Sequence, residues 1–224
     1  MQFFPSPNFN DRRTGAAIQH LILHYTGMRT SDEAIARLRD PAGQVSAHYI
    51  VDLDGAIVQL VEENQRAWHA GVSFWAGETD INSTSIGIEI VNPGHEFGYV
   101  PFPEVQITAV IQLCEGILSR HAIPPYNVLA HSDIAPTRKM DPGELFPWVA
   151  LAKQGVGLWL AHEPEGKKRK TENDLVEYGY DVSNLPAAIT AFQRHFTPEK
   201  ISGEWDDACA VRLAWLIAKK SEYC

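Results

Sequence analysis

Short apolar runs alternate with polar segments through the first 160 residues, and the runs predict buried strands. Residues 18–24 form a largely apolar run that ends at His24 and predicts a buried strand. Residues 46–52 and 56–61 are joined by Leu53-Asp54-Gly55, a sequence typical of a hairpin turn. A further short strand is predicted at 127–130.

Residues 85–92 predict the most informative strand, because isoleucines at 86, 88 and 90 alternate with other residue types. The period of two places Gly87 and Glu89 on one face, where glycine leaves room beside the carboxylate. A glutamate in an apolar strand is costly unless it is paired, functional or exposed at a sheet edge. This strand alone does not decide between an exposed edge position and a functional role.

Helical spacing appears between the predicted strands. An apolar stripe from 103 to 122 predicts a long core-packing helix, and Ser31 begins a second helical pattern that Pro41 stops. Residues 146–152 predict a short closing helix. Strands that alternate with helices indicate an α/β fold.

The composition changes after residue 160. Residues 161–173 are polar without apolar periodicity and predict a linker. Beyond them, 174–180, 185–196 and 206–219 show short amphipathic helical patterns. We therefore expect a small three-helix module at 174–224, close to the lower size limit for independent folding.

Composition and charge exclude several classes of protein. The 224 residues are 45% hydrophobic and 21% charged, which is typical of a globular protein. The formal net charge of −9 gives no indication of a nucleic-acid partner. No apolar run reaches the roughly 20 residues of a membrane span. The three cysteines are too widely spaced to predict a disulfide framework or a metal-ligand pair.

Residues 131–142, His-Ser-Asp-Ile-Ala-Pro-Thr-Arg-Lys-Met-Asp-Pro, predict a loop that presents polar side chains at a site. Its two prolines exclude a helix interior. His131 and Asp141 are suitable zinc ligands, but two ligands do not make a site. His24, at the end of another predicted strand, is a candidate third ligand, although a lone histidine is more often a core residue.

Two histidines and a carboxylate leave the fourth tetrahedral position of Zn²⁺ open, as in catalytic rather than structural zinc sites. Glu89 is then a candidate general base that takes a proton from water and returns it to a leaving amine. Lys139 is a candidate for stabilising an oxyanion. Periodicity alone does not bring these side chains together in space.

Five motifs occur in order along the chain: Ile-Leu-His-Tyr-Thr, Val-Ser-Ala-His-Tyr, Arg-Ala-Trp-His-Ala-Gly, Ser-Ile-Gly-Ile-Glu and His-Ser-Asp-Ile-Ala-Pro-x-Arg-Lys-x-Asp-Pro-Gly. Together they resemble the zinc-dependent N-acetylmuramoyl-L-alanine amidases of the AmpD/AmiD type, which are related to the peptidoglycan recognition proteins. The resemblance covers roughly residues 15 to 160. Five ordered motifs are far more specific than any one of them.

The resemblance implies a mixed central β-sheet flanked by helices in an amidase domain at 1–160. It also implies zinc-dependent hydrolysis of the amide between (anhydro-)N-acetylmuramic acid and L-alanine of the peptidoglycan stem peptide. By matching motif, it assigns His24, His131 and Asp141 as zinc ligands and Glu89 and Lys139 as catalytic residues. It places four further residues in the substrate cleft: His48, Trp68, His69 and Arg138.

The terminal module resembles three-helix peptidoglycan-binding domains through Gly-Tyr-Asp-Val and Ala-Ile-Thr-Ala-Phe-Gln-Arg-His-Phe. The expected partner is therefore peptidoglycan or a soluble muropeptide, bound by a monomer. The amino terminus lacks the pattern of a standard signal peptide, which favours a cytoplasmic enzyme that recycles muropeptides. The wall-binding module fits a periplasmic enzyme instead.

One departure from the family concerns the peptide. Some cytosolic members are expected to hold the diaminopimelate carboxylate with an arginine just before the Ser-Ile-Gly-Ile-Glu strand. Residues 76–85 contain no arginine here. The sequence therefore leaves peptide specificity and the preference for an anhydro sugar open.

Two rival functions remain at this stage. Relatives that lose a zinc ligand recognise peptidoglycan without cutting it, but all the proposed ligands and catalytic residues are present here. A zinc peptidase acting within the stem peptide is the second rival. The absence of a His-Glu-x-x-His helix argues against it.

Overall fold

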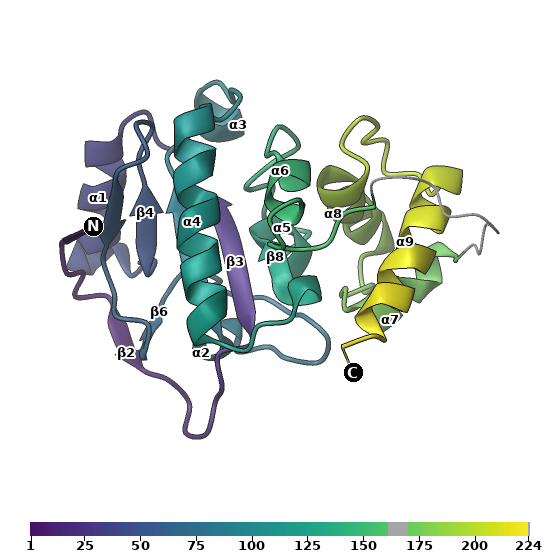
Figure 1. Ribbon diagram of the computed structural model, residues 1–224, viewed down its shortest axis with the longest axis horizontal. Coiled ribbons are helices and arrows are strands. Elements are labelled where there is room, and N and C mark those ends of the chain that lie inside the picture. Colours follow the sequence, from purple (N-terminus) through teal and green to yellow (C-terminus); the bar gives the residue numbers. More distant parts are fainter. Residues whose placement is uncertain (161–169, 224) are drawn as a thin grey trace.

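The computed structural model describes residues 1–160 and 170–223. A mixed six-stranded sheet forms its centre (Figure 1). In spatial order the strands are β1 (Gln2–Phe3), β5 (Ile57–Gln59), β4 (Tyr49–Val51), β7 (Ser85–Ile90), β3 (His20–Tyr25) and β8 (Val128–Ala130). All neighbours pair in parallel except β4 and β5, which form the predicted hairpin. This arrangement confirms the predicted α/β class with a mixed sheet.

One face of the sheet is covered by α4 (Glu104–Arg120), which lies in front of the strands in Figure 1. Alternate residues of β3, β7 and β8 point toward α4 and join its apolar stripe in one buried cluster. The closing helix α6 (Trp148–Ala152) extends this cluster with Trp148 and Leu151. The long helical stripe seen in the sequence is thus the core-facing side of α4.

The other face is covered at two places. Helix α1 (Ser31–Arg39) packs Ala34 and Leu38 against Ile50 of β4. Toward β8, the carboxyl-terminal helices pack against Ile22 and Leu129. The strand positions between these two clusters carry Gly87, Glu89 and His24 instead of large apolar side chains.

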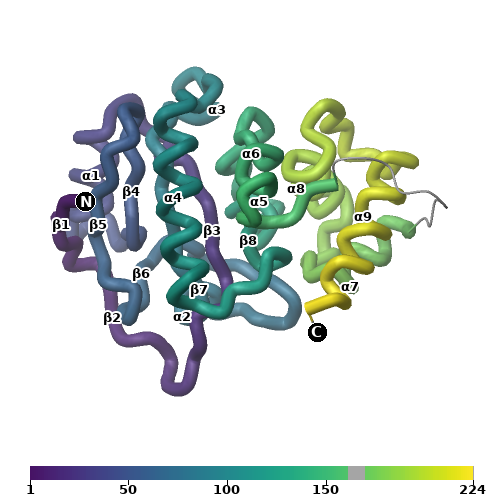
Figure 2. Tube along the Cα trace, in the orientation of Figure 1, coloured from purple at the N-terminus to yellow at the C-terminus, as the bar shows by residue number. Residues whose placement is uncertain are grey.

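The three predicted carboxyl-terminal helices are present as α7 (Leu175–Tyr178), α8 (Leu185–Phe196) and α9 (Asp207–Lys220). Figure 2 shows them beside β8 and the short helix α5 (His131–Ile134). Their apolar cluster is continuous with that of the sheet, since it contains Ile134 as well as Phe192 and Leu213. Residues 161–169 of the predicted linker lie outside the described residues, and its end enters a 3-10 turn, η3 (Glu172–Asp174).

Several elements went beyond the prediction. The sequence predicts a loop throughout 131–142, but this stretch begins with one helical turn, α5. The Asp133 side chain caps the turn by accepting a hydrogen from the backbone N–H of Ala130. The prolines at 136 and 142 lie beyond this turn, so the turn is sterically allowed. Short elements without a clear periodic signal complete the fold: β2 (Phe9–Asp11), η1 (Pro41–Gly43), β6 (Gln65–Ala67), α2 (Ile81–Thr84), α3 (Gly94–Phe97) and η2 (Pro125–Asn127). None of the helices in the described part of the chain combines the length and apolarity required to span a bilayer.

Candidate active site

The site lies where three adjacent parallel strands end. In the register of β3 and β7, His24 is directly opposite Glu89. In the register of β3 and β8, Leu23 is opposite Ala130, so His131 follows next to His24. Loops at the carboxyl ends of parallel strands are the usual place for functional groups in α/β sheets. The sheet topology therefore brings together residues that are 107 positions apart in the chain.

Three side-chain atoms converge at this edge. Nδ1 of His24 lies 2.9 Å from Nδ1 of His131, and each nitrogen lies 3.0 Å from Oδ2 of Asp141. All three side chains are buried. Among the described residues they form a group of histidine and acidic side chains whose ligand atoms are close enough to share a metal ion.

The hydrogen bonds behind the two histidines show what the group can hold. Nε2 of His131 lies 3.1 Å from the carbonyl oxygen of Ala70, so it must carry the hydrogen and donate it. Nδ1 of a neutral His131 is then an acceptor that faces the Asp141 carboxylate. We assign His24 in the same way, with its Nε2 donating over 3.0 Å to Nδ1 of His69.

Three acceptors without a hydrogen to share repel one another unless a cation lies between them. Two imidazole nitrogens and one carboxylate suit zinc, whose bonds of about 2.0–2.1 Å in a tetrahedron separate ligand atoms by about 3.3 Å. The observed separations of 2.9–3.0 Å are within a few tenths of an ångström of that value. The donor set therefore fits a zinc ion.

Protonation favours the same conclusion. Burial and the neighbouring His131 lower the pKa of His24 to about 4, although Asp141 acts in the opposite direction. Burial alone would raise the pKa of Asp141, but the two histidines outweigh it and hold that pKa well below its usual range. Near neutral pH the site thus presents a neutral His24 and an ionised Asp141, the forms that bind metals.

Glu89 lies beside this group on a central strand, which excludes the exposed-edge alternative. Its Oε2 is buried and has no hydrogen-bond partner among the described residues. Burial, and then the charge of Asp141, raise the pKa of Glu89 well above its usual value, whereas Lys139 lowers it. A buried carboxylate oxygen without a partner is rare in folded proteins unless it serves a function.

A cavity of about 350 Å³ opens onto these groups. Helix α1 forms one wall and the loop 138–141 forms another. Of the residues predicted to contact substrate, three line this cavity: Trp68, His69 and Arg138. Lys139, predicted to be catalytic, also lines it.

His48 does not line the cavity, and the structure corrects its predicted place in the cleft. The side chain is fully buried. Its Nδ1 accepts a hydrogen from the backbone N–H of Gly87 over 3.0 Å, and its Nε2 lies 3.1 Å from the carbonyl oxygen of Gln65. The His48 ring supports the backbone of β7 at Gly87 and lies beside the ring of His69, with the centroids 5.7 Å apart. Sequence spacing cannot separate this position from one that lines the cavity.

Gly87 has a role that the alternating pattern only partly revealed. The space beside Glu89 is filled by the ring of His69, and a Cβ at Gly87 would lie 2.4 Å from that ring. His69 in turn contacts His24 through Nδ1 and Ser85 Oγ through Nε2, the latter at 3.0 Å. Gly87 therefore leaves room for His69, which supports His24, a candidate metal ligand, by bonding to the far side of its ring.

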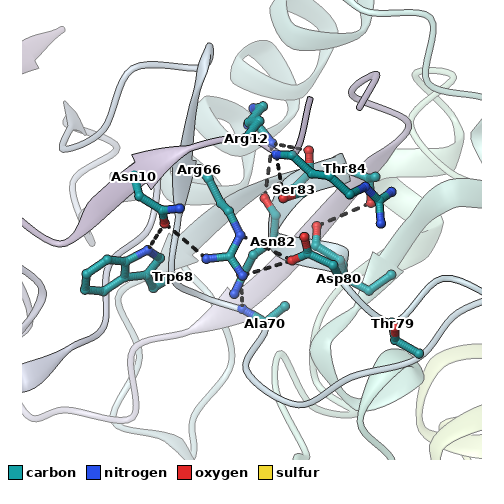
Figure 3. A network of polar contacts seen from close by, with 12 residues as sticks. Asn10, Arg12, Arg66, Trp68, Ala70, Thr79, Asp80, Asn82, Ser83 and Thr84 are labelled. Atoms are coloured by element: carbon teal, nitrogen blue, oxygen red, sulfur yellow. Dashed lines mark hydrogen bonds and ion pairs between the residues drawn. The ribbon is translucent and has the colours of Figure 1, made fainter. Parts of the chain in front are cut away.

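Sequence reasoning missed the polar network that holds the His69 segment (Figure 3). Oδ1 of Asn82 accepts hydrogens from the backbone N–H groups of His69 and Ala70 at 3.0 and 2.8 Å. The guanidinium of Arg12 donates hydrogen bonds to several backbone carbonyl oxygens, including those of Glu63 and Ser85. These residues bond mainly to backbone atoms far away in sequence, so no local spacing indicates their role.

Residues 14–144 match the family model described as N-acetylmuramoyl-L-alanine amidase. The chain is 41% identical to the N-acetylmuramoyl-L-alanine amidase AmiD of Escherichia coli over 220 residues, 84% of this chain and 78% of that protein. It is 32% identical over 161 residues to the 1,6-anhydro-N-acetylmuramyl-L-alanine amidase AmpD of Haemophilus influenzae, 64% of this chain and 85% of that protein.

Solved structures agree over nearly the whole chain. The complex of E. coli AmiD with anhydro-N-acetylmuramic acid-L-Ala-D-γ-Glu-L-Lys superposes with a TM-score of 0.80 at 39% identity, over 93% of this chain and 92% of that one. AmpDh3 of Pseudomonas aeruginosa in complex with anhydromuramic pentapeptide gives 0.81 at 34% identity, over 93% and 95%. With a family match across more than half of its length, around a site of the kind its motifs predicted, the chain belongs to the N-acetylmuramoyl-L-alanine amidase family.

Proposed function

We propose that this protein is a zinc-dependent amidase that hydrolyses the bond between N-acetylmuramic acid, or its anhydro form, and L-alanine of a peptidoglycan stem peptide. The observation that carries the proposal is the unpartnered Glu89 Oε2 beside three converging acceptors. A site built only for recognition needs neither a free buried carboxylate nor a cation-binding triad. Membership of the amidase family and the muropeptides named in the related complexes support the substrate class.

His24, His131 and Asp141 would hold the zinc ion. Bound there, zinc supplies Lewis acidity that activates water and polarises the scissile carbonyl. Their second-layer partners fix the ligands in place: the carbonyl oxygen of Ala70 behind His131, and His69 behind His24. Such partners orient imidazole rings and set which nitrogen is free to bind.

Glu89 would act as the general base. Its position opposite His24 in the strand register holds the carboxylate at the floor of the cavity, and Oε2 makes no competing hydrogen bond among the described residues. The carboxylate accepts a proton from water at Oε2 and returns it to the leaving amine of L-alanine. Burial raises the pKa of Glu89, which makes its carboxylate a stronger base, and the nearby charge of Lys139 offsets part of this shift.

Cationic side chains around the cavity suit an anionic substrate. Arg37 from α1, Arg138 and Lys139 all line it. Lys139 would stabilise negative charge on the carbonyl oxygen during attack. Arg37 would pair with a carboxylate of the stem peptide, a role that the arginine-free segment 76–85 does not supply. Arg138 donates to the carbonyl oxygens of Ala70 and Val72, so it would mainly hold that loop at the edge of the cavity.

Mass spectrometry of the products tests this function. The purified chain is incubated with soluble anhydromuropeptides and, separately, with intact sacculi, each with and without a chelator. We expect free stem peptide that begins at L-alanine, with release abolished by the chelator and restored by zinc. Glu89→Gln serves as the inactive control that still binds metal.

The outcomes separate the alternatives. Cleavage within the stem peptide would identify a peptidase, and zinc binding without cleavage of either substrate would identify a recognition protein. Cleavage of soluble fragments alone would support the cytoplasmic recycling role that we propose. Cleavage of sacculi would support a role at the cell wall.

A further inference from the structure

We propose that the carboxyl-terminal helices position the metal ligands of the amidase site. This inference rests on the proposed function, and it concerns residues of the module that touch neither substrate nor metal. Tyr180, Arg194 and His195 contact the two loops that carry His131 and Asp141. The module thus acts as a clamp on half of the ligand set, whether or not it also binds peptidoglycan.

The first contact is a buried polar cluster at Asp133, two residues after the ligand His131. Oδ1 of Asp133 accepts the hydroxyl hydrogen of Tyr180 over 2.6 Å, and Oδ2 accepts from Nδ1 of His195 over 2.7 Å. Oδ2 also accepts from the backbone N–H of Ala130 over 2.8 Å. Asp133 and Tyr180 have no exposed surface, and His195 has almost none.

This cluster fixes the helical turn that bears the ligand. Asp133 closes α5 by bonding to Ala130, so the side chain that caps the turn is the one held by the module. The His195 ring is itself held between the rings of Trp148 and Phe196, each 3.8 Å away between centroids. The donor at Nδ1 therefore has little freedom to follow a displaced Asp133.

The second contact reaches the Asp141 loop. Nε of Arg194, the neighbour of His195 on α8, lies 3.5 Å from Oε2 of Glu144, three residues after the ligand Asp141. Glu144 also contacts Nε2 of His95 at 3.2 Å. The opposite nitrogen of that ring lies 3.0 Å from the hydroxyl of Tyr25, which lines the cavity.

The two held loops are joined directly, since the backbone N–H of Ser132 donates to the carbonyl oxygen of Asp141 over 3.0 Å. A shift of either loop therefore moves both ligands. Apolar packing between module and sheet does not require polar contacts at these places. A fully buried carboxylate destabilises the protein unless its partners are accurately placed, so the Asp133 cluster defines one position for α5.

Tyrosine-to-phenylalanine variants of the full-length chain test the clamp. Tyr180→Phe removes the hydroxyl bonded to Asp133 and leaves the apolar ring in place. Tyr178→Phe is the matched control, because Tyr178 is equally buried in the same cluster, and no hydrogen bond between it and Asp133 occurs in the described structure. The zinc dissociation constant is measured by competition with a chelator, and the cobalt-substituted proteins are compared by absorption spectroscopy.

We expect Tyr180→Phe to weaken zinc binding about 10-fold, the low end of the range for direct partners of a ligand, because Tyr180 acts through Asp133. The cobalt spectrum should also change. The control should bind zinc like the wild type. His195→Ala should weaken binding further, and His195→Asn should restore part of it, because its amide can donate from the place of Nδ1. The value of kcat should fall with little change in KM.

Hydrogen exchange of the metal-free proteins provides a readout that does not depend on zinc. Backbone amides within 130–141 should exchange faster in Tyr180→Phe than in Tyr178→Phe. The clamp is overturned if Tyr180→Phe and His195→Ala bind zinc within threefold of the wild type, or if Tyr178→Phe loses as much affinity as Tyr180→Phe. A wild-type chain that neither binds zinc nor cleaves muropeptides would instead overturn the proposed function, whatever the exchange rates show.

Discussion

Two polar networks in this protein, one partly exposed and one buried, differ in how many of their polar atoms have hydrogen-bond partners. One is centred on Glu63, whose carboxylate accepts hydrogens from the hydroxyl of Tyr49, the guanidinium of Arg120 and the ring of His121, at 2.6–3.2 Å. The other is the candidate active site. There, three acceptors face one another and Glu89 Oε2 has no partner among the described residues.

Whether the polar atoms have hydrogen-bond partners distinguishes a structural network from a functional site more clearly than burial does. Cations and donors surround Glu63, so its network is complete and needs nothing from outside. The site at the ends of β3, β7 and β8 has an excess of acceptors, so it is complete only with a cation and a reacting molecule. Unsatisfied buried groups persist where function requires them.

The largest effect expected from this comparison is on activity. Glu89→Gln should lower kcat by about 10³-fold, within the range for loss of a general base, and should leave zinc content and folding intact. Glu63→Gln should leave kcat unchanged. Steady-state kinetics with metal analysis checks both, and retained turnover in Glu89→Gln would exclude the general-base role.

Zinc binding should depend on the candidate active site and not on the Glu63 network. His131→Ala removes one of the three proposed zinc ligands. It should weaken zinc binding by more than about 100-fold, since even residues that only hydrogen-bond to a ligand contribute about 10–100-fold. His121→Ala removes a histidine from the Glu63 network and should leave zinc bound. Metal content after dialysis distinguishes them, and equal zinc content in the two variants would remove His131 from the ligand set.

Gly87→Ala tests the support of His24. The added Cβ would meet the His69 ring at 2.4 Å, so His69 must move. Overpacking of this kind costs about 1–3 kcal/mol, and the displaced ring should also weaken zinc binding. Gly116→Ala is the control, because its Cβ meets only the end of Arg120 at 3.3 Å and helix propensity favours alanine.

Denaturant unfolding of the metal-free forms measures this pair of variants. We expect a lower free energy of unfolding for Gly87→Ala and an unchanged or higher one for Gly116→Ala. If Gly87→Ala were as stable as the wild type and bound zinc equally well, the close packing of His69 on this strand would not matter for the site.

The smallest expected effect concerns the Glu63 network and depends on pH. Burial alone would raise the pKa of Glu63, but hydrogen bonds from Arg120, His121 and Tyr49 lower it to about 2, against an ordinary 4.5. A depressed folded-state pKa stabilises the protein fully above about pH 4.5, and this contribution is lost as the pH falls toward 2.

Glu63→Gln should therefore lower the free energy of unfolding by about 1–2 kcal/mol at pH 6, after allowance for solvent screening. The difference in the free energy of unfolding between variant and wild type should be smaller when both proteins are unfolded by denaturant at pH 3. A difference that stays constant between pH 6 and pH 3 would show that the ionised carboxylate is not what stabilises this network.

Much of the local structure follows from the sequence by itself. An apolar run predicted β3, and period-two and helical spacing predicted β7 and α4, because one face of each of these two elements must be buried. The five ordered motifs indicated the residues of the site, and the spacing of apolar positions predicted the three terminal helices. These features depend on residues that are close together in the sequence, so sequence patterns are enough to predict them.

Tertiary structure decided how those residues meet. Strand order placed β7 at the centre of the sheet, which buried Oε2 of Glu89 and set the residue opposite His24. The same order set His48 against the backbone of Gly87, beside His69, rather than in the lining of the cavity. The contacts of Tyr180 and His195 with Asp133 join segments 47 and 62 residues apart. Strand register and packing between distant segments depend on the whole fold, so the local spacing of residues cannot predict them.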